Sequence, residues 1–201
     1  MFTGIITDVA TVTAIENMES GKRMTLACNF EMDAIPMGAS IACDGACMTV
    51  IEKTANNFTV EISPESLERT TLGAWEIDTK VNLERPVGVG DEFGGHFVTG
   101  HVDVVGKVEA FENYGEFWAL VISYPKPFGV YLAEKGSVAI NGTSLTVNSV
   151  KRDALIFSVM VIPHTLDETN LGHLEKGSFI NLEADLIARY LLAQKQEQEA
   201  A

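Results

Sequence analysis

The sequence predicts an all-β protein in which two copies of one small barrel follow each other and a single helix completes the chain. Three observations support this prediction. Four sequence blocks occur twice in the same order. Each copy contains about six short β-branched and aromatic segments separated by turn residues. The residues after 184 instead carry apolar side chains at helical spacing.

The duplication is the strongest of these observations. The second member of each pair lies 96 to 99 residues after the first, so only small loop changes separate the copies. Both copies end on Asn-Leu-Glu. The paired blocks are residues 3–12 with 99–108, 40–50 with 137–147, 64–73 with 163–172, and 82–84 with 181–183.

Each copy is expected to consist of short strands, such as 58–62 and 155–161, joined by tight turns. The expected turns include Gly38, Asp44-Gly45, Asn141-Gly142 and Lys176-Gly177. A module of this size must protect its strand edges, and closure into a barrel does so. The blocks that begin at Pro64 and Pro163 predict a short helix over one barrel end, with Gly73 or Gly172 after the last turn.

The tail predicts one helix, with Asp185 as its natural N-cap. Its apolar residues are Leu186, Ile187, Tyr190, Leu191 and Leu192. Because both barrels are already closed, this broad stripe predicts burial against another chain; packing on its own chain is the alternative. We place the domain boundaries at 1–93 for the first barrel, 94–184 for the second, and 185–201 for the oligomerisation helix and tail.

Composition excludes several classes of function. The net charge of −14 argues against a nucleic-acid partner, which would require clustered basic residues. There is no apolar run of about 20 residues and no basic leader, so we expect a cytoplasmic protein without a membrane partner. The glycine-rich segment 85–95 lacks the third glycine of a dinucleotide-binding turn.

The cysteines predict neither a disulfide framework nor a metal site. Their number is odd, and no histidine lies near Cys43 and Cys47 in sequence. His96 and His101 would lie on opposite faces of a strand, which makes a shared metal improbable. His164 and His173 have no counterpart in the first copy and are expected at the surface.

Hydroxyl side chains kept in both copies indicate recognition of a polar ligand edge. Ser40 corresponds to Ser137 and Thr49 to Thr146, although turn capping and strand propensity are alternative explanations. Other positions differ: Cys47 corresponds to Ser144, Ile5 to His101, and Phe2 to Val98. Cys47 is either a small buried side chain or a reactive thiol, and His101 either a core residue or a site residue.

The start MFTGII and the blocks GACMTV, GGHFVTGHV and NGTSLTV resemble riboflavin synthase of the α-subunit type, over the whole chain including the tail helix. The resemblance implies two six-stranded Greek-key barrels and dismutation of two molecules of 6,7-dimethyl-8-ribityllumazine, without cofactor or metal. One molecule gives a four-carbon unit to the other, which yields riboflavin and 5-amino-6-(D-ribitylamino)uracil. It further implies a homotrimer held by the C-terminal helices, with a site between the barrels of neighbouring subunits. Lumazine synthase is a further candidate partner.

By position, the family's ligand contacts carry over to both barrels. For the first barrel they are Gly4, Ile5, Ile6, Cys47, Met48, Thr49, Glu61, Ile62, Ser63, Pro64, Glu65 and Ser66. For the second they are Gly100, His101, Val102, Lys135, Ser144, Leu145, Thr146, Met160, Val161, Ile162, Pro163, His164 and Thr165.

The reactive candidates are Ser40, Cys47, His101 and Asp185, with Phe2 shaping the site. His101 is the leading acid/base group, because a histidine pKa lies near neutrality. Cys47 or Ser40 would add to C7 of one lumazine or orient the water or ribityl hydroxyl that does so. The alternative function is a lumazine or flavin carrier or antenna without turnover, and a weaker one is a structural barrel that binds no ligand.

Overall fold

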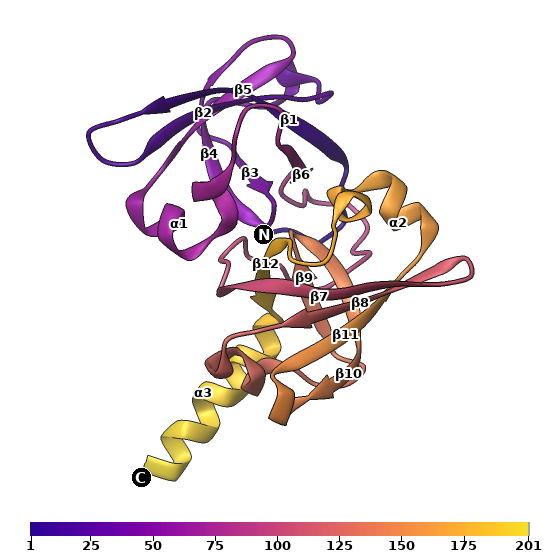
Figure 1. The fold of residues 1–201 in the computed structure, drawn as a ribbon. Helices are drawn as coiled ribbons and strands as arrows, with labels where there is room; N and C mark the ends of the chain where they lie inside the picture. The colour runs from indigo at the N-terminus through magenta and orange to yellow at the C-terminus, as the bar shows by residue number, and fades with distance from the viewer. Residues whose placement is uncertain (201) are drawn as a thin grey trace.

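The computed structural model describes the backbone of residues 1–200 and the side chains of residues 1–198. It contains two closed six-stranded antiparallel barrels followed by one helix (Figure 1), which confirms the predicted fold. The strand order β1-β2-β5-β4-β3-β6 of the first barrel is repeated in the second as β7-β8-β11-β10-β9-β12, a Greek-key arrangement in both. No helix among the described residues is long and apolar enough to cross a membrane.

Corresponding elements of the two barrels have similar lengths. The first barrel comprises β1 (Asp8–Asn17), β2 (Lys22–Ala27), β3 (Ser40–Cys43), β4 (Ala46–Lys53), β5 (Asn57–Ile62), α1 (Pro64–Arg69) and β6 (Lys80–Glu84). The second comprises β7 (Val104–Tyr114), β8 (Phe117–Ser123), β9 (Ser137–Ile140), β10 (Thr143–Lys151), β11 (Ile156–Val161), α2 (Pro163–Glu168) and β12 (Phe179–Ala184). The helix α3 (Leu186–Ala200) follows. Leu155, expected to begin β11, instead has a left-handed φ of 53° and precedes the strand.

Each barrel is filled by its own side chains. Leu26, Phe58 and Leu83 belong to the first core, and Phe157 and Leu182 belong to the second. Because successive strand residues point to opposite faces, the core residues of β4 alternate with residues on the outer face of the barrel. Any ligand site formed by the hydroxyl and thiol positions of β4 and β10 therefore lies outside the barrels.

The hairpins β3–β4 and β9–β10 turn through Asp44-Gly45 and Asn141-Gly142, as predicted. All four residues have positive φ, between 44° and 79°, as a type I′ turn requires. The two turns meet: a Cβ on Gly45 would lie 2.7 Å from the backbone nitrogen of Gly142. Glycine at these positions therefore allows the two barrels to approach each other.

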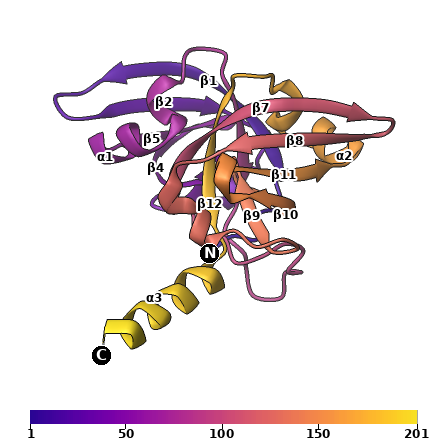
Figure 2. The ribbon, with the colours of Figure 1, turned by 60° about the horizontal axis from the view of Figure 1, so that its bottom comes forward.

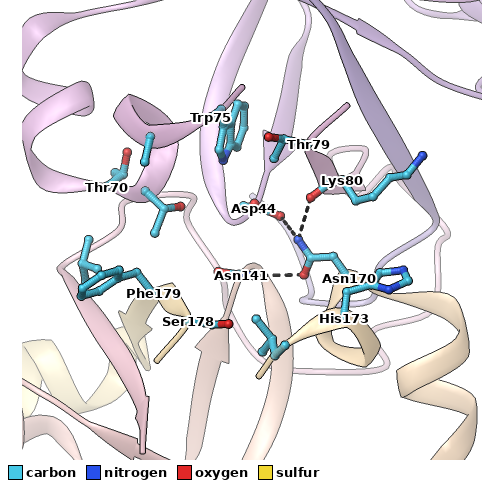
Figure 3. Close-up of a pocket in the computed structure, with 14 residues that line it drawn as sticks. Asp44, Thr70, Trp75, Thr79, Lys80, Asn141, Asn170, His173, Ser178 and Phe179 are labelled. Carbon is cyan, nitrogen blue, oxygen red and sulfur yellow. Dashed lines mark hydrogen bonds between the residues drawn. The ribbon is translucent and has the colours of Figure 1, made fainter. Parts of the chain in front are cut away.

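A buried polar network joins the barrels around this contact, and Figure 3 shows the part of it around Asn170. Asp44 Oδ1 accepts hydrogen bonds from the Asn82 backbone N–H and from Asn170 Nδ2, each at 2.8 Å. Asn181 Nδ2 donates to the Asp44 carbonyl oxygen at 2.9 Å, and Asn82 Nδ2 donates to that of Asn141 at 3.0 Å. Burial raises the pKa of Asp44 to about 7, although the hydrogen bonds from the Asn82 N–H and Asn170 Nδ2 favour the carboxylate.

The two short helices form where Pro64 and Pro163 predicted them, but each ends before the predicted glycine. Gly73 instead lies in a following 3₁₀ helix, Thr71–Ala74. A Cβ there would come 2.6 Å from the Leu67 carbonyl oxygen, so this glycine permits the chain to pack back against α1.

The base of α3 is fixed to the second barrel, and the rest of the helix extends away from it (Figure 2). Arg189 Nη2 donates to both oxygens of Asp103 at 2.8 Å, and Asp103 also accepts the Ala184 backbone N–H. Ile187, Tyr190 and Leu191 remain 57%, 67% and 62% exposed. The apolar stripe of this helix is thus largely uncovered by its own chain.

Candidate functional site

Two segments that precede the barrels, residues 1–6 and 97–102, lie side by side between them. Phe2 and Val98 form a two-way backbone bridge, with N···O distances of 2.8 and 3.1 Å, and both side chains are fully buried. They pack with Ala42 and Ala139, and Cys47 packs against this cluster. Phe2 therefore supports the backbone next to Cys47.

Each segment contacts the barrel that does not follow it in the chain. The Ser144 N–H of the second barrel donates to the Gly4 carbonyl oxygen at 2.8 Å, and the Cys47 N–H of the first donates to that of Gly100 at 2.9 Å. Both glycines have positive φ, 79° and 83°, and a Cβ on Gly100 would lie 2.5 Å from Cys47 Cβ. Only glycine fits this close approach.

This exchange corrects the predicted assignment of ligand contacts to barrels. Residues 100–102, assigned to the second barrel's site, lie against the first barrel, and Gly4, assigned to the first, lies against Ser144 of the second. The prediction was wrong because sequence order places each segment at the start of its own barrel, whereas backbone hydrogen bonds attach it to the other one.

The first site is a cavity of about 260 Å³ on the outer face of the first barrel. Seven predicted residues line it: Cys47, Met48, Glu65, Ser66, Gly100, His101 and Val102. Ala46, Arg69 and Thr70 line it as well and were missed. Arg69 could have been found, because it lies one helical turn after Glu65 and pairs with it at 3.1 Å.

The cavity combines a thiol, an imidazole and a cation. Cys47 is half-buried and His101 is exposed, so both are accessible to a ligand. Burial raises the pKa of the Cys43 thiol well above its ordinary value and also raises the pKa of Cys28, which disfavours their thiolates. Among the three cysteines, Cys47 alone lines the cavity. Nucleophilic and proton-transfer groups thus meet there.

The remaining predicted residues of the first barrel lie close in the chain to the residues that line this cavity. Ser40 pairs with Thr49 across β3 and β4, two ladder positions from Cys47. Ser63 is the N-cap of α1 and its Oγ accepts the Ser66 N–H at 3.1 Å. Ile62 is buried in the core, Glu61 pairs with Arg23 at 2.8 Å, and Pro64 is exposed. Ile62 therefore supports the barrel rather than facing solvent.

The second group of predicted residues is centred on Ser144, on the outer face of β10. Its Oγ lies 2.7 Å from Nδ1 of His96, a residue that was predicted on a strand face and outside the site. Residues 96–101 do not form a strand beyond the Val98 bridge. Gly95 makes the approach possible, since a Cβ there would lie 2.9 Å from Ser144 Cβ.

His96 is 7% exposed, and within the described chain its Nε2 has no hydrogen-bond partner. Burial lowers its pKa, while the negative charge of Asp185 partly opposes this effect. Asp185 Oδ1 also accepts the Ile187 N–H at 2.9 Å, so the predicted capping of α3 is confirmed. His96 therefore lies between the second site and the start of the helix.

The other predicted residues of the second barrel lie on the same elements as their first-barrel counterparts. Leu145 and Thr146 follow Ser144 on β10, and Thr146 pairs with Ser137 as Thr49 pairs with Ser40. Lys135 is exposed in the turn before β9, with φ 66°. Ile5 is 45% exposed and Ile6 half-buried. Residues 160–165 run from the end of β11 into α2, and Val161 is buried in the core.

A larger cavity of about 530 Å³ lies between the barrels beside the polar network (Figure 3). Its walls include Asp44, Trp75, Asn170 and Phe179, and none of the predicted site residues.

In the described part of the chain, no three His, Cys, Asp or Glu side chains are grouped so that they could hold a metal.

Comparison with known proteins agrees with this architecture. The model of the lumazine binding domain matches residues 3–86 and again residues 99–185. A riboflavin synthase of Brucella abortus (strain 2308) is 40% identical, with 98% of this chain and all of that protein covered. One of Bacillus subtilis (strain 168) is 35% identical, with 95% of this chain and 88% of that protein covered.

Solved structures show the same fold. LumP complexed with 6,7-dimethyl-8-(1'-D-ribityl) lumazine is 25% identical, with a TM-score of 0.81 over 92% of this chain and 99% of that one. LumP complexed with riboflavin has the same identity and coverage and a TM-score of 0.82. One conclusion follows from the two matched repeats, the sequence identity over nearly the whole chain, and the two barrels. This chain belongs to the lumazine-binding repeat family that includes the riboflavin synthases.

Proposed function

We propose that this protein is a riboflavin synthase, a transferase that dismutates two molecules of 6,7-dimethyl-8-ribityllumazine. One molecule gives a four-carbon unit to the other, and the products are riboflavin and 5-amino-6-(D-ribitylamino)uracil. The electrons are redistributed between two identical substrates, so the reaction needs no redox cofactor. The observation that carries the proposal is the pair of related outer-face sites, one at Cys47 and His101 and one at Ser144 and His96.

Two related sites suit a reaction between two identical molecules. Each barrel would hold one lumazine, and bringing the two together lowers the entropic cost of their reaction. The C7 methyl of one lumazine must lose a proton, and C7 of the other must be attacked by a nucleophile. Among the predicted reactive residues, His101 is accessible in the first cavity and suits proton transfer.

Cys47 is better placed than Ser40 as the attacking or water-orienting group. Cys47 lines the cavity together with His101, whereas Ser40 lies two ladder positions away beside Thr49. Asp185 and Phe2 would act indirectly, by positioning other groups. Asp185 lies near His96, and Phe2 supports the backbone at Cys47. The remaining predicted contacts on β4, α1, β10 and α2 would hold the pterin edges and ribityl chains.

The complete site would form between the first barrel of one subunit and the second barrel of its neighbour in a homotrimer. The uncovered stripe of α3 supports this, together with an apolar groove of about 490 Å³ between α3, Met1 and Phe97. We further propose a cytoplasmic location, association with lumazine synthase, and the boundaries 1–93, 94–184 and 185–201.

The test is to incubate the purified chain with 6,7-dimethyl-8-ribityllumazine alone and to follow riboflavin formation by absorbance. We expect turnover without added cofactor, and its reduction in the His101→Ala and Cys47→Ala variants. Glu19→Gln, an exposed change in the β1–β2 turn, is the control. Tight binding of the lumazine without any riboflavin would reject the enzyme and leave a carrier protein.

A further inference from the structure

Two buried carboxylates hold the segments that cross between the barrels. Glu84 ends β6 and Glu183 lies near the end of β12, and they are 4% and 3% exposed. Neither lines the first cavity, and neither was predicted as a site residue. They are the glutamates of the repeated Asn-Leu-Glu sequence that closes each copy.

The two carboxylates make the same three hydrogen bonds. Glu183 Oε1 accepts the Thr99 backbone N–H at 2.7 Å and Thr99 Oγ1–H at 2.6 Å, and its Oε2 accepts the Gly100 N–H at 3.0 Å. Glu84 accepts the corresponding groups of Thr3 and Gly4 at 2.7, 2.8 and 2.9 Å. All three donors are satisfied only by two acceptor oxygens, which an ionised carboxylate provides and an amide does not.

Each held segment then reaches the opposite barrel. The Gly100 carbonyl oxygen accepts the Cys47 N–H, and the next residue, His101, enters the first barrel's cavity. The Gly4 carbonyl oxygen accepts the Ser144 N–H in the same way. A carboxylate of the second barrel therefore fixes the backbone that brings His101 to the first site, and a carboxylate of the first barrel does so for the second.

We infer that Glu183 and Glu84 are crossed positioning residues: Glu183 sets the place of His101 in the first barrel's site, and Glu84 sets the place of Gly4 beside Ser144 in the second. Neither carboxylate touches the ligand. The inference rests on the proposed function for its site, but its effect on ligand binding can be measured without turnover.

The experiment compares Glu183→Gln and Glu84→Gln, each alone and combined with His101→Ala or Ser144→Ala. The dissociation constant of 6,7-dimethyl-8-ribityllumazine is measured by fluorescence titration, and kcat and KM by riboflavin formation. We expect Glu183→Gln to lower kcat/KM on the order of 100-fold, since displacement of a reacting group by about 1 Å has this effect. In the His101→Ala background its effect should shrink to about twofold, because the group that it positions is gone.

The matched comparison tests whether each glutamate acts on the site of the opposite barrel. Glu183→Gln should keep its full effect in the Ser144→Ala background, and Glu84→Gln should keep its own effect in the His101→Ala background. Glu19→Gln removes a carboxylate from an exposed turn and should leave the dissociation constant and kcat/KM unchanged. If Glu183→Gln does not fold, Thr99→Val removes only the Oγ1 hydrogen bond, and its smaller effect should show the same dependence on His101.

Equal losses for both glutamate variants in every background would overturn the inference and leave the carboxylates a structural role alone. A stronger coupling of Glu183 to Ser144 than to His101 would overturn it as well. If the wild-type chain binds the lumazine without producing riboflavin, the proposed function fails, and the dissociation constants still decide whether the carboxylates act across the barrels.

Discussion

His96 Nδ1 lies 2.7 Å from Ser144 Oγ, although 48 residues separate the two in the chain. This contact gives the second barrel a hydroxyl held by an imidazole. Because burial lowers the pKa of His96, the neutral ring is favoured and one ring nitrogen can accept a proton. Such a pair is equipped to orient or deprotonate a ligand group beside Ser144.

Replacing His96 by Gln should therefore impair turnover more than folding. We expect kcat to fall about 10- to 100-fold, in the range of lost acid–base assistance or misplaced groups. The measurement is riboflavin formation, with thermal unfolding recorded in parallel. His173→Gln, an exposed change outside both sites, is the control. An unchanged kcat in His96→Gln would assign His96 to packing alone.

The raised pKa of Asp44 predicts that the stability of the contact between the barrels depends on pH. Its pKa is raised by burial from 3.8 to about 7, so the folded state binds this proton more tightly than the unfolded state. The stabilisation is fully present below pH 4 and is lost as the pH rises through 7. The shift corresponds to at most about 4 kcal/mol.

Asp44→Asn removes this ionisation and imitates Asn141 of the second copy, and its Oδ1 can keep both accepted hydrogen bonds. Urea unfolding at pH 5 and pH 8 should show that wild-type loses more free energy of unfolding than the variant over this interval. Equal losses in the two proteins would contradict the raised pKa.

Gly100→Ala tests the close approach of its segment to β4. Gly38 offers a matched control, because its φ of 81° is almost the same but a Cβ there would have open space. Both substitutions carry the left-handed backbone cost of about 1–2 kcal/mol. Gly100→Ala should add a further 1–3 kcal/mol from the clash with Cys47 and should also reduce riboflavin formation. Chemical denaturation of both variants measures the difference, and equal destabilisation would rule out the contact.

The exposed stripe of α3 predicts the basis of assembly. Replacing Ile187 and Leu191 with Lys puts two charges on the face that we expect to contact neighbouring subunits. Size-exclusion chromatography coupled to light scattering should then report a monomer, whereas we expect a trimer for wild-type. Turnover should fall as well, because the proposed site lies between subunits. Gln198→Lys, an exposed change further along the helix, should keep the wild-type mass. An unchanged mass in the double variant would place the interface elsewhere.

Much of the fold was predictable because the same turn and strand patterns occur in both copies of the repeat. The turns Asp44-Gly45 and Asn141-Gly142 require positive φ, and both hairpins form around them. The site was less predictable. Cys47, His101 and α1 were identified in sequence and do line one cavity. Arg69 was missed despite its helical spacing from Glu65, and His96 was misjudged because the segment that carries it was taken for a strand.

The sequence by itself determined two small barrels, their turns and a capped terminal helix, because these depend on local periodicity, on turn chemistry and on comparison of one repeat with the other. Only the tertiary structure decided which barrel each glycine segment serves. Backbone hydrogen bonds from the Ser144 N–H to the Gly4 carbonyl oxygen and from the Cys47 N–H to that of Gly100 cross between the barrels, and Glu84 and Glu183 hold the two glycine segments. Both cross-barrel hydrogen bonds join backbone groups of residues far apart in the chain, so local sequence patterns do not indicate which barrel each segment contacts.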